Sequence, residues 1–281
     1  MQRRDFLKLI LLNAISLGAV SEALAKIIKI PGAPPAQYFD DHLKDYLHKM
    51  RAFDQHHPED IYLDKEQRSL FRTILKRFDR LQQIVGHGNF HLLNFDDALA
   101  ISGNYSRVGR FSKAELELLE MIFYNEASGY GFWGEKPLKR LSDKIPKSKA
   151  VKIPRTGNYL FEGPAFETYQ KIKNKLGDPV ILTSGIRSII KQLHLFLKKT
   201  YASEYNLSMA SRSLAPPGYS YHGIGDFDVG QIGFGVDNFT ERFTATAVCR
   251  KLEDLGYISL RYRKGNLLGV RFEPWHIKVS F

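Results

Sequence analysis

The stretch from Gly218 to Gly230 reads GYSYHGIGDFDVG. It places one histidine, His222, and two carboxylates, Asp226 and Asp228, within seven residues and between glycines. A second polar group follows much later, where residues 273–276 read EPWH. Imidazole and carboxylate side chains from distant parts of a chain can converge only when the fold brings the two segments together. The sequence therefore predicts that the fold is organised around a shared polar site.

These residue types suit a metal site. A catalytic zinc usually takes three protein ligands from histidine and carboxylate side chains and keeps one position open. His222, Asp228 and His276 supply such a set, and Glu273 is a carboxylate that could act as a general base. Cys249 is the only cysteine, which excludes both an intramolecular disulfide and a cysteine-based zinc site. Any metal must therefore be held by histidine and carboxylate.

Asp226 and Asp228 are both candidates for the carboxylate ligand. They lie two residues apart, so on a strand both side chains face the same side. One could bind the metal while the other orients a histidine ligand from behind. The residues alone leave this choice open.

The apolar pattern predicts an α+β fold: a small, mainly antiparallel sheet with helices that carries the zinc site, preceded by a mostly helical N-terminal region. Residues 41–125 show helical periodicity, and capping boxes are expected at Asp64–Gln67 and Ser112–Glu115. Residues 126–164 are rich in glycine, proline and lysine and have weak periodicity. The pattern therefore divides the chain into a mostly helical region at 41–164 and a catalytic domain at 165–281.

Within 165–281 the expected elements alternate. We expect a helix at 166–176, a strand at 179–183, a helix through 197, a loop at 202–218 and a strand at 227–229. A further helix would be capped by Asn238 or Thr240, and three closing strands would cover 257–262, 267–272 and 277–281.

The N-terminus predicts export. Arg3 and Arg4 precede a short apolar run, and Ala23-Leu24-Ala25 fits a cleavage site, as in a twin-arginine signal peptide. We therefore expect a signal at 1–25, a proline-containing linker at 26–40, a periplasmic mature protein and no stable transmembrane segment after cleavage. The chain carries a formal net charge of +11. Export argues against nucleic acid as the partner of this basic chain and leaves an anionic wall polymer or a solvated basic surface.

Three motifs in order carry a resemblance to a known family. Residues 184–188 read SGIRS and precede Gln192, residues 220–228 read SYHGIGDFD, and residues 273–276 read EPWH. Together they resemble the SGYRS…Q, SxHxxG…D and EPWH elements of the zinc D-alanyl-D-alanine carboxypeptidases, the LAS-type metallopeptidases related to vancomycin-resistance enzymes. The resemblance covers about residues 165–281 and does not extend to residues 26–164.

The resemblance implies a role for each matching residue. His222 and His276 would bind Zn²⁺, and Glu273 would be the general base that activates water. Arg187 would bind the substrate near the scissile carbonyl and polarise it. Ser220 and Gln192 would hold the C-terminal D-alanine or shape its pocket.

The chain departs from the family at the aspartate ligand. The family has its aspartate seven residues after the first histidine, where this chain has Val229. Aligning Asp-Val-Gly with the family's Asp-hydrophobic-Gly strand favours Asp228, with one residue fewer in the glycine turn. Asp226 remains the alternative ligand.

The resemblance thus implies an exported zinc metallopeptidase that hydrolyses peptide bonds next to D-alanine in peptidoglycan stem peptides, as a D,D-carboxypeptidase. A D-Ala-D-Ala dipeptidase or a peptidoglycan endopeptidase would use the same site. A hypothesis of another class is a non-catalytic peptidoglycan-binding protein with a degenerate metal site, which the shortened His-to-Asp spacing motivates. The sequence does not predict an oligomeric state.

Overall fold

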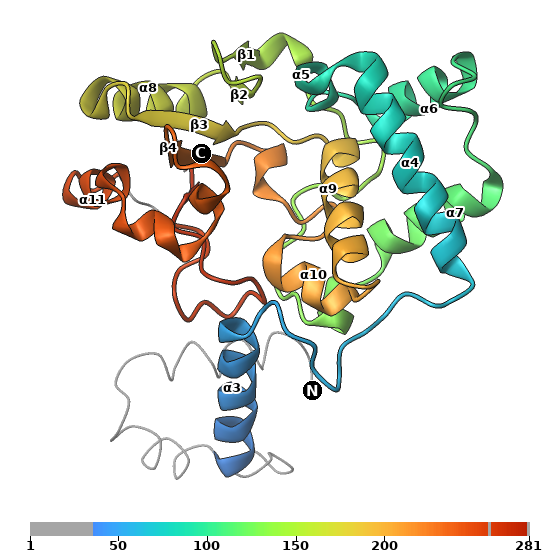
Figure 1. Cartoon of the computed structure of the whole chain (residues 1–281), viewed down its shortest axis with the longest axis horizontal. Coiled ribbons are helices and arrows are strands. Elements are labelled where there is room, and N and C mark those ends of the chain that lie inside the picture. The colour runs from blue at the N-terminus through green and yellow to red at the C-terminus, as the bar shows by residue number, and fades with distance from the viewer. Residues whose placement is uncertain (1–35, 258–259, 280–281) are drawn as a thin grey trace. The chain divides into compact units, whose positions relative to one another are not determined.

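The computed structural model describes residues 36–257 and 260–279 (Figure 1). The expected signal peptide at 1–25 lies outside the described residues, as does the expected linker up to residue 35. The chain divides into two compact units at 1–51 and 52–281. In the first unit, helix α3 (Ala36–Arg51) includes residues 36–40 of the expected linker. None of the described helices is long and apolar enough to cross a membrane.

The second unit begins with the helices that the sequence predicts. They are α4 (Gln67–Val85), α5 (His87–Phe90), α6 (Phe95–Asn104) and α7 (Lys113–Tyr124). The capping box at the start of α7 is confirmed, because the Ser112 hydroxyl accepts from the Glu115 amide and the Glu115 carboxylate accepts from the Ser112 amide. The Asp64–Gln67 box is wrong: Gln67 is the first residue of α4, and its amide donates to the backbone carbonyl of Asp64.

A segment of loops and short elements joins these helices to the C-terminal half. It holds two 3₁₀ turns, η1 (Ala127–Tyr130) and η2 (Lys147–Lys149), and an antiparallel hairpin of β1 (Ala150–Lys152) and β2 (Tyr159–Phe161). The weak periodicity of residues 126–164 therefore corresponds to irregular structure.

The C-terminal half is built on a three-stranded antiparallel sheet in the order β3-β4-β5. The strands are β3 (Val180–Ser184), β4 (Phe227–Gln231) and β5 (His276–Ile277). The helices are α8 (Pro164–Leu176), α9 (Ile189–Ala202), α10 (Leu207–Ser213) and α11 (Ala247–Asp254), with 3₁₀ turns η3 (Tyr221–Gly223), η4 (Gly235–Phe239) and η5 (Glu241–Ala245). The α+β prediction is confirmed.

Several local predictions for this half differ from the structure. Helix α10 occupies part of the expected loop at 202–218, because the Asn206 side chain caps it. Thr240 does cap an element, but it is the 3₁₀ turn η5, whereas α11 begins at Ala247 and is capped by Thr246. Asn238 instead binds the backbone of Gln231.

The closing strands also differ. Residues 267–272 form no strand, because their backbone groups bind other segments: the Leu268 carbonyl accepts from Trp133 in a loop, and the Arg271 amide donates to the carbonyl of Arg212 in α10. In the described part of the expected strand at 277–281, only Ile277 pairs, as part of β5. In the expected strand at 257–262, Leu260 makes a single bridge to Ile277.

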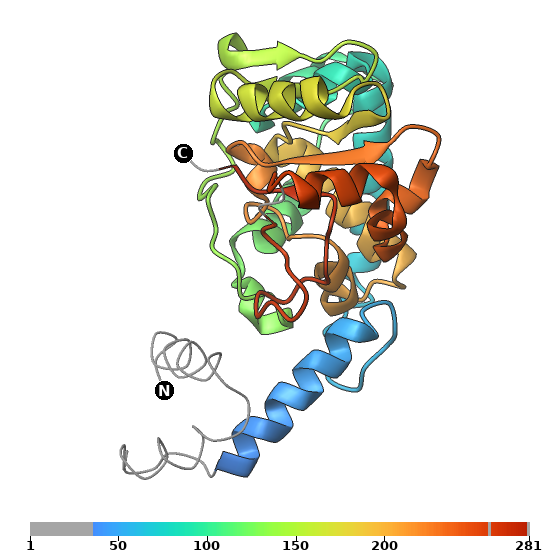
Figure 2. The same ribbon diagram turned by 90° about the vertical axis from the view of Figure 1, so that its left-hand side faces the viewer.

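Two apolar cores flank the site. In the first, α4, α6 and α7 pack against α9 and α10, so the N-terminal helices and the C-terminal half share one core. In the second, α8 and α11 pack against the sheet through Phe227 and Val229 of β4. Helix α8 runs alongside the sheet in both views (Figures 1 and 2). Because side chains alternate along a strand, Asp228 between these two residues faces away from the α8–α11 core. The division at residue 164/165 between a helical region and a catalytic domain stays a prediction.

Candidate metal and active site

The sheet register aligns three polar residues. Ser184 of β3 is opposite Asp228 of β4, and Asp228 is opposite His276 of β5. A bulge between Leu182 and Ser184 shifts the end of β3 into this register. The two halves of the predicted site, which are about fifty residues apart in sequence, therefore meet across adjacent strands.

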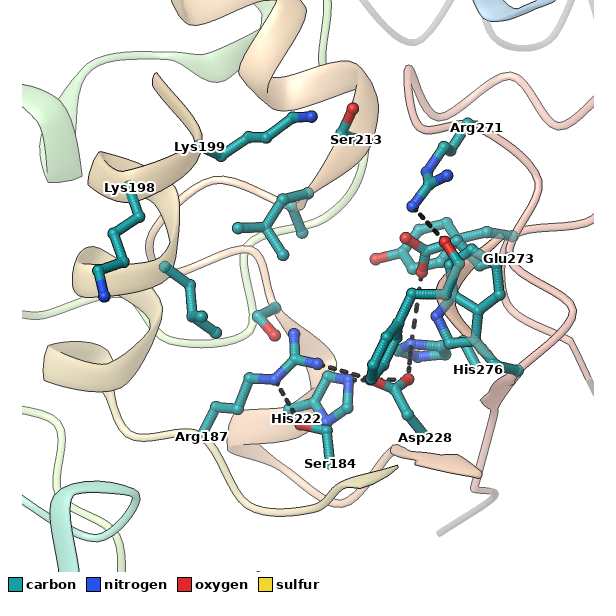
Figure 3. Close-up of a pocket in the computed structure, with 17 residues that line it drawn as sticks. Ser184, Arg187, Lys198, Lys199, Ser213, His222, Asp228, Arg271, Glu273 and His276 are labelled. Atoms are coloured by element: carbon teal, nitrogen blue, oxygen red, sulfur yellow. Dashed lines mark hydrogen bonds and ion pairs between the residues drawn. The ribbon is translucent and has the colours of Figure 1, made fainter. Parts of the chain in front are cut away.

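His222, Asp228 and His276 present three atoms to one point. His222 Nε2 lies 3.3 Å from Asp228 Oδ1, and His276 Nδ1 lies 3.1 Å from the same oxygen. One ligand atom from each residue lies within 4.8 Å of the others, and all three side chains are buried. Figure 3 shows the three side chains converging at one end of a cavity. Such a cluster can hold a metal ion.

The opposite atom of each side chain is bound by the protein. His222 Nδ1 donates to the Gly185 carbonyl at 2.8 Å, and Asp228 Oδ2 accepts from Arg187 Nη2 at 2.6 Å. His276 Nε2 donates to Asp226 Oδ2 at 3.0 Å. These contacts fix the ring orientations and leave Nε2, Oδ1 and Nδ1 directed at the shared point. Outer contacts of this kind are what orients metal ligands in proteins.

The cluster has buried polar atoms without hydrogen-bond partners, and these atoms suit a bound zinc ion. His222 Nε2 and Asp228 Oδ1 are fully buried and have no hydrogen-bond partner among the described residues. Buried polar atoms in folded proteins almost always have a partner, and two imidazoles with one carboxylate are a common ligand set for zinc. Burial lowers the pKa of His222 to about 4, which keeps its ring neutral at physiological pH. At His276 burial also lowers the pKa, but the hydrogen bond to Asp226 and the nearby Asp228 carboxylate outweigh it and raise the pKa to about 9, so a metal ion would have to displace a proton there.

Asp226 lies behind the His276 ring. Its oxygens accept from His276, from Arg261 and from the Val279 amide. Burial opposes ionisation, but the hydrogen bonds from His276 and Arg261 outweigh it and hold the Asp226 pKa well below its usual range. Arg261 in turn lies 3.3 Å from the ring centre of Tyr221. Both oxygens of Asp226 thus accept hydrogen bonds, whereas Asp228 Oδ1 accepts none and faces His222 Nε2 and His276 Nδ1.

Glu273 lies beside the cluster. Its Oε2 is 3.7 Å from His276 Nδ1, and the residue is only 8% exposed. Burial raises the Glu273 pKa to about 7, and the nearby Asp228 charge adds to this rise. A carboxyl group that titrates near neutral pH can both accept and return a proton there.

Arg187 is positioned by the turn after β3. A side chain at Gly185 would place its Cβ 2.0 Å from the Tyr159 carbonyl oxygen, so only glycine fits this close approach of two backbones. From this turn Arg187 donates through Nε to Ser184 Oγ at 2.8 Å, in addition to its bond to Asp228. Its guanidinium therefore reaches the cavity at the edge of the ligand cluster.

A cavity of about 440 Å³ opens onto these residues, and Ser220 is in its wall. Gln192 is buried on α9 outside the cavity wall, and its amide donates to the Ala215 carbonyl. Since Ala215 does line the cavity, Gln192 shapes the wall from behind.

Sequence reasoning assigned no role to several residues of the cavity wall: Ser184, Lys198, Lys199, Ser213, Tyr262 and Arg271. Two of them carried a usable signal. Ser184 begins the SGIRS motif. Arg271 lies two residues before Glu273, so on an extended segment it faces the same side. The lysines belong to an amphipathic helix, where nothing in the sequence separates a cavity lysine from a surface lysine.

Comparison with known families places this region. Residues 163–280 match the family model of VanY, D-alanyl-D-alanine carboxypeptidase. The C-terminal region is similar to that family. The matched segment agrees with the span of about 165–281 that the motifs indicate. The resemblance is thereby confirmed, and the ligand cluster, Arg187 and Glu273 all lie inside the VanY-type segment.

Two solved structures are similar to the chain. One is the LD-carboxypeptidase LdcB, described with the molecular basis of peptidoglycan recognition, at 25% identity and a TM-score of 0.37 over 46% of this chain and 62% of that chain. The other is a mutant of the vancomycin-resistance D,D-pentapeptidase VanY with Zn(II), at 23% identity and a TM-score of 0.37 over 48% of this chain and 82% of that chain. The chain thus spans less than two thirds of the LdcB chain. A comparison with curated protein sequences found no significant match.

Proposed function

We propose that the protein is an exported zinc metallopeptidase that hydrolyses peptide bonds next to D-alanine in peptidoglycan stem peptides. The observation that carries the proposal is the set of inward-facing atoms of His222, Asp228 and His276, two of them buried without a partner, beside Arg187 and Glu273 in one cavity. The match of residues 163–280 to the D-alanyl-D-alanine carboxypeptidase family model supports the choice of substrate.

In this proposal Asp228 is the third zinc ligand and Asp226 orients His276. Asp228 Oδ1 supports this assignment, because it accepts no hydrogen bond and faces both histidine nitrogens, whereas both oxygens of Asp226 are engaged elsewhere. Zinc held by the three ligands would act as a Lewis acid toward the substrate carbonyl and the attacking water.

The chain's own residues would move the proton and stabilise the charge. Glu273 would accept a proton from the attacking water and return it to the nitrogen of the leaving amine. The Arg187 guanidinium would donate to the carbonyl oxygen as negative charge develops on it. Ser184 and Asp228 hold that guanidinium in place, so little reorganisation would accompany the reaction.

The test is incubation of purified, zinc-loaded protein with muropeptides, followed by mass spectrometry of the products. Loss of one terminal D-alanine is the expected result. Release of the D-Ala-D-Ala dipeptide would instead indicate a dipeptidase, and cleavage inside stems or cross-links an endopeptidase.

Glu273→Gln separates the chemistry from metal binding. The variant should keep its zinc, and its turnover should fall about 10²- to 10⁴-fold, the usual contribution of a positioned acid–base group. Glu253→Gln, an exposed residue on α11, is the matched control and should retain full activity. Retained turnover in Glu273→Gln would remove Glu273 from its role. A wild-type protein that binds muropeptides without cleaving them would favour the non-catalytic hypothesis.

A further inference from the structure

Two cations and a hydroxyl group lie at the far end of the cavity. Lys199 comes from α9, Ser213 from the end of α10, and Arg271 from the segment that leads to Glu273. Figure 3 shows the three at the end of the cavity opposite Arg187 and Asp228. They are therefore separate from the ligand cluster but share its cavity.

These groups keep unused hydrogen-bonding capacity. In the part of the chain that the structure describes, Lys199 Nζ forms no hydrogen bond or ion pair, and the buried Ser213 Oγ has no partner. Arg271 donates through Nη2 to the Phe239 carbonyl at 2.9 Å, and its buried Nε has no partner. The Arg271 guanidinium is held 4.6 Å from the ring centre of Phe53 and 4.9 Å from that of Trp275.

The two cations also disfavour each other. Burial lowers the pKa of Lys199, and the Arg271 charge lowers it further, while Asp54 opposes the shift. Burial likewise lowers the pKa of Arg271, with Glu273, Asp54 and Glu241 acting against it. Like charges in a partly buried cavity are costly unless an anion is bound between them. An anionic ligand group would relieve this repulsion and satisfy the unpaired donors.

We propose that Lys199, Ser213 and Arg271 form the subsite for the free C-terminal carboxylate of the peptide substrate. This inference rests on the proposed peptidase function. A carboxylate has two oxygens and is matched by the planar fork of an arginine together with an ammonium and a hydroxyl. In a carboxypeptidase the terminal carboxylate lies just beyond the scissile bond, so its subsite must share the cavity of the reacting groups. An endopeptidase substrate has no charge at that place.

The subsite makes the protein an exopeptidase, which a pair of substrates can test. One is a stem peptide that ends in D-Ala-D-Ala with a free carboxylate, and the other is the same peptide with a C-terminal amide. Wild-type protein should prefer the acid. Lys199→Gln should lower kcat/KM for the acid about tenfold to a hundredfold, the usual contribution of hydrogen bonds to a charged group, and leave kcat/KM for the amide within about twofold.

Further variants separate recognition from folding. Lys199→Arg keeps the charge and should restore the preference for the acid, and Ser213→Ala should weaken it without changing the amide rate. Arg271→Gln should behave as Lys199→Gln does, provided its circular dichroism matches wild type. Lys113→Gln is the charge control, because that lysine is exposed on α7 away from the cavity.

Several outcomes would overturn the subsite. Equal wild-type rates on acid and amide would do so, as would a Lys199→Gln variant that loses both substrates in proportion. A third peptide tests the other source of the anion, because only its internal side-chain carboxylates are amidated. If wild-type protein cleaves this peptide more slowly than the acid and Lys199→Gln abolishes that difference, Lys199 recognises an internal carboxylate and the C-terminal assignment is wrong. A wild-type protein that cleaves none of the three peptides would remove the proposed function itself.

Discussion

The protein buries two clusters of opposite charges, and they differ in how completely they are paired. In the first, Arg212 of α10 donates to both oxygens of Asp60 and to the carbonyls of Phe53 and Gln55. Asp60 also accepts from Asn206 and from the His57 amide. In the second, around Asp228, two ligand atoms stay unpartnered although they are equally buried.

The difference separates a structural cluster from a functional one. A buried ion pair is tolerated when every lone pair and proton has a partner, as at Asp60. Unpaired buried atoms cost free energy, so they persist only where something else in the molecule holds them in place. At Asp228 the rigid register of three strands and the outer contacts of each ligand do this. The unpaired cluster is therefore the one we expect to bind a ligand.

The largest effect is expected at the fully paired cluster. Asp60→Ala leaves the buried Arg212 without its counter-charge, and breaking such a pair should lower the free energy of unfolding by about 3–5 kcal/mol. Zinc content per folded molecule should not change. Urea denaturation and metal analysis measure the two quantities. Asp178→Ala, at an exposed ion pair with Lys173, is the control and should leave the denaturation midpoint unchanged. Loss of zinc in Asp60→Ala would contradict the separation of the two clusters.

The next effect is at the unpaired cluster. Asp228→Ala should lower zinc affinity more than about a hundredfold, since outer partners of metal ligands alone contribute 10- to 100-fold. Peptide hydrolysis should disappear with the metal. The measurement is competition with a zinc chelator. Asp237→Ala, which breaks only a surface pair with Arg242, should retain wild-type affinity. Wild-type zinc affinity in Asp228→Ala would refute the assignment of the ligand.

Low pH should reduce the contribution of the Asp60–Arg212 cluster to stability over a defined pH range. Burial alone would raise the Asp60 pKa, but hydrogen bonds from Arg212 and Asn206 outweigh it and lower that pKa from 3.8 to about 2. Because the carboxyl is more acidic in the folded protein, its contribution is complete above pH 3.8 and is lost as the pH falls through 2. The loss is about 2 kcal/mol. Denaturation from pH 5 to 2 should show that the free energy of unfolding falls more in wild type than in Asp60→Asn. An equal fall in both proteins would contradict the prediction.

Local signals explain how much of the fold could be predicted. The capping box at Ser112 and the apolar periodicity of α4, α8 and α9 depend on neighbouring residues, so the sequence reveals them. Residues 267–272 have strand-like composition, yet their backbone bonds to a distant loop and to helix α10. Such pairing is decided by tertiary contacts, which no local pattern contains.

The site was predictable where motifs carry it. His222, Asp228, His276, Glu273 and Arg187 were chosen from sequence and lie around one cavity. The choice between the two aspartates needed the register of β4 with β5, and the place of Gln192 behind the wall needed the packing of α9. Lys199 and Arg271 could not be found together, because only the fold brings α9 and the segment before β5 to one cavity.

Asp226 combines the features of both clusters and gives the smallest but most discriminating effect. Like Asp60 it is fully engaged, by Arg261 and the Val279 amide, and like Asp228 it contacts His276. Asp226→Asn keeps the shape but removes the charge that raises the basicity of the His276 ring. Zinc affinity should therefore fall about tenfold, at the lower limit for an outer partner, with zinc still bound at saturation. Chelator competition on Asp226→Asn and Asp228→Ala side by side measures the contrast. If Asp226→Asn loses zinc completely while Asp228→Ala keeps it, the two carboxylates exchange roles.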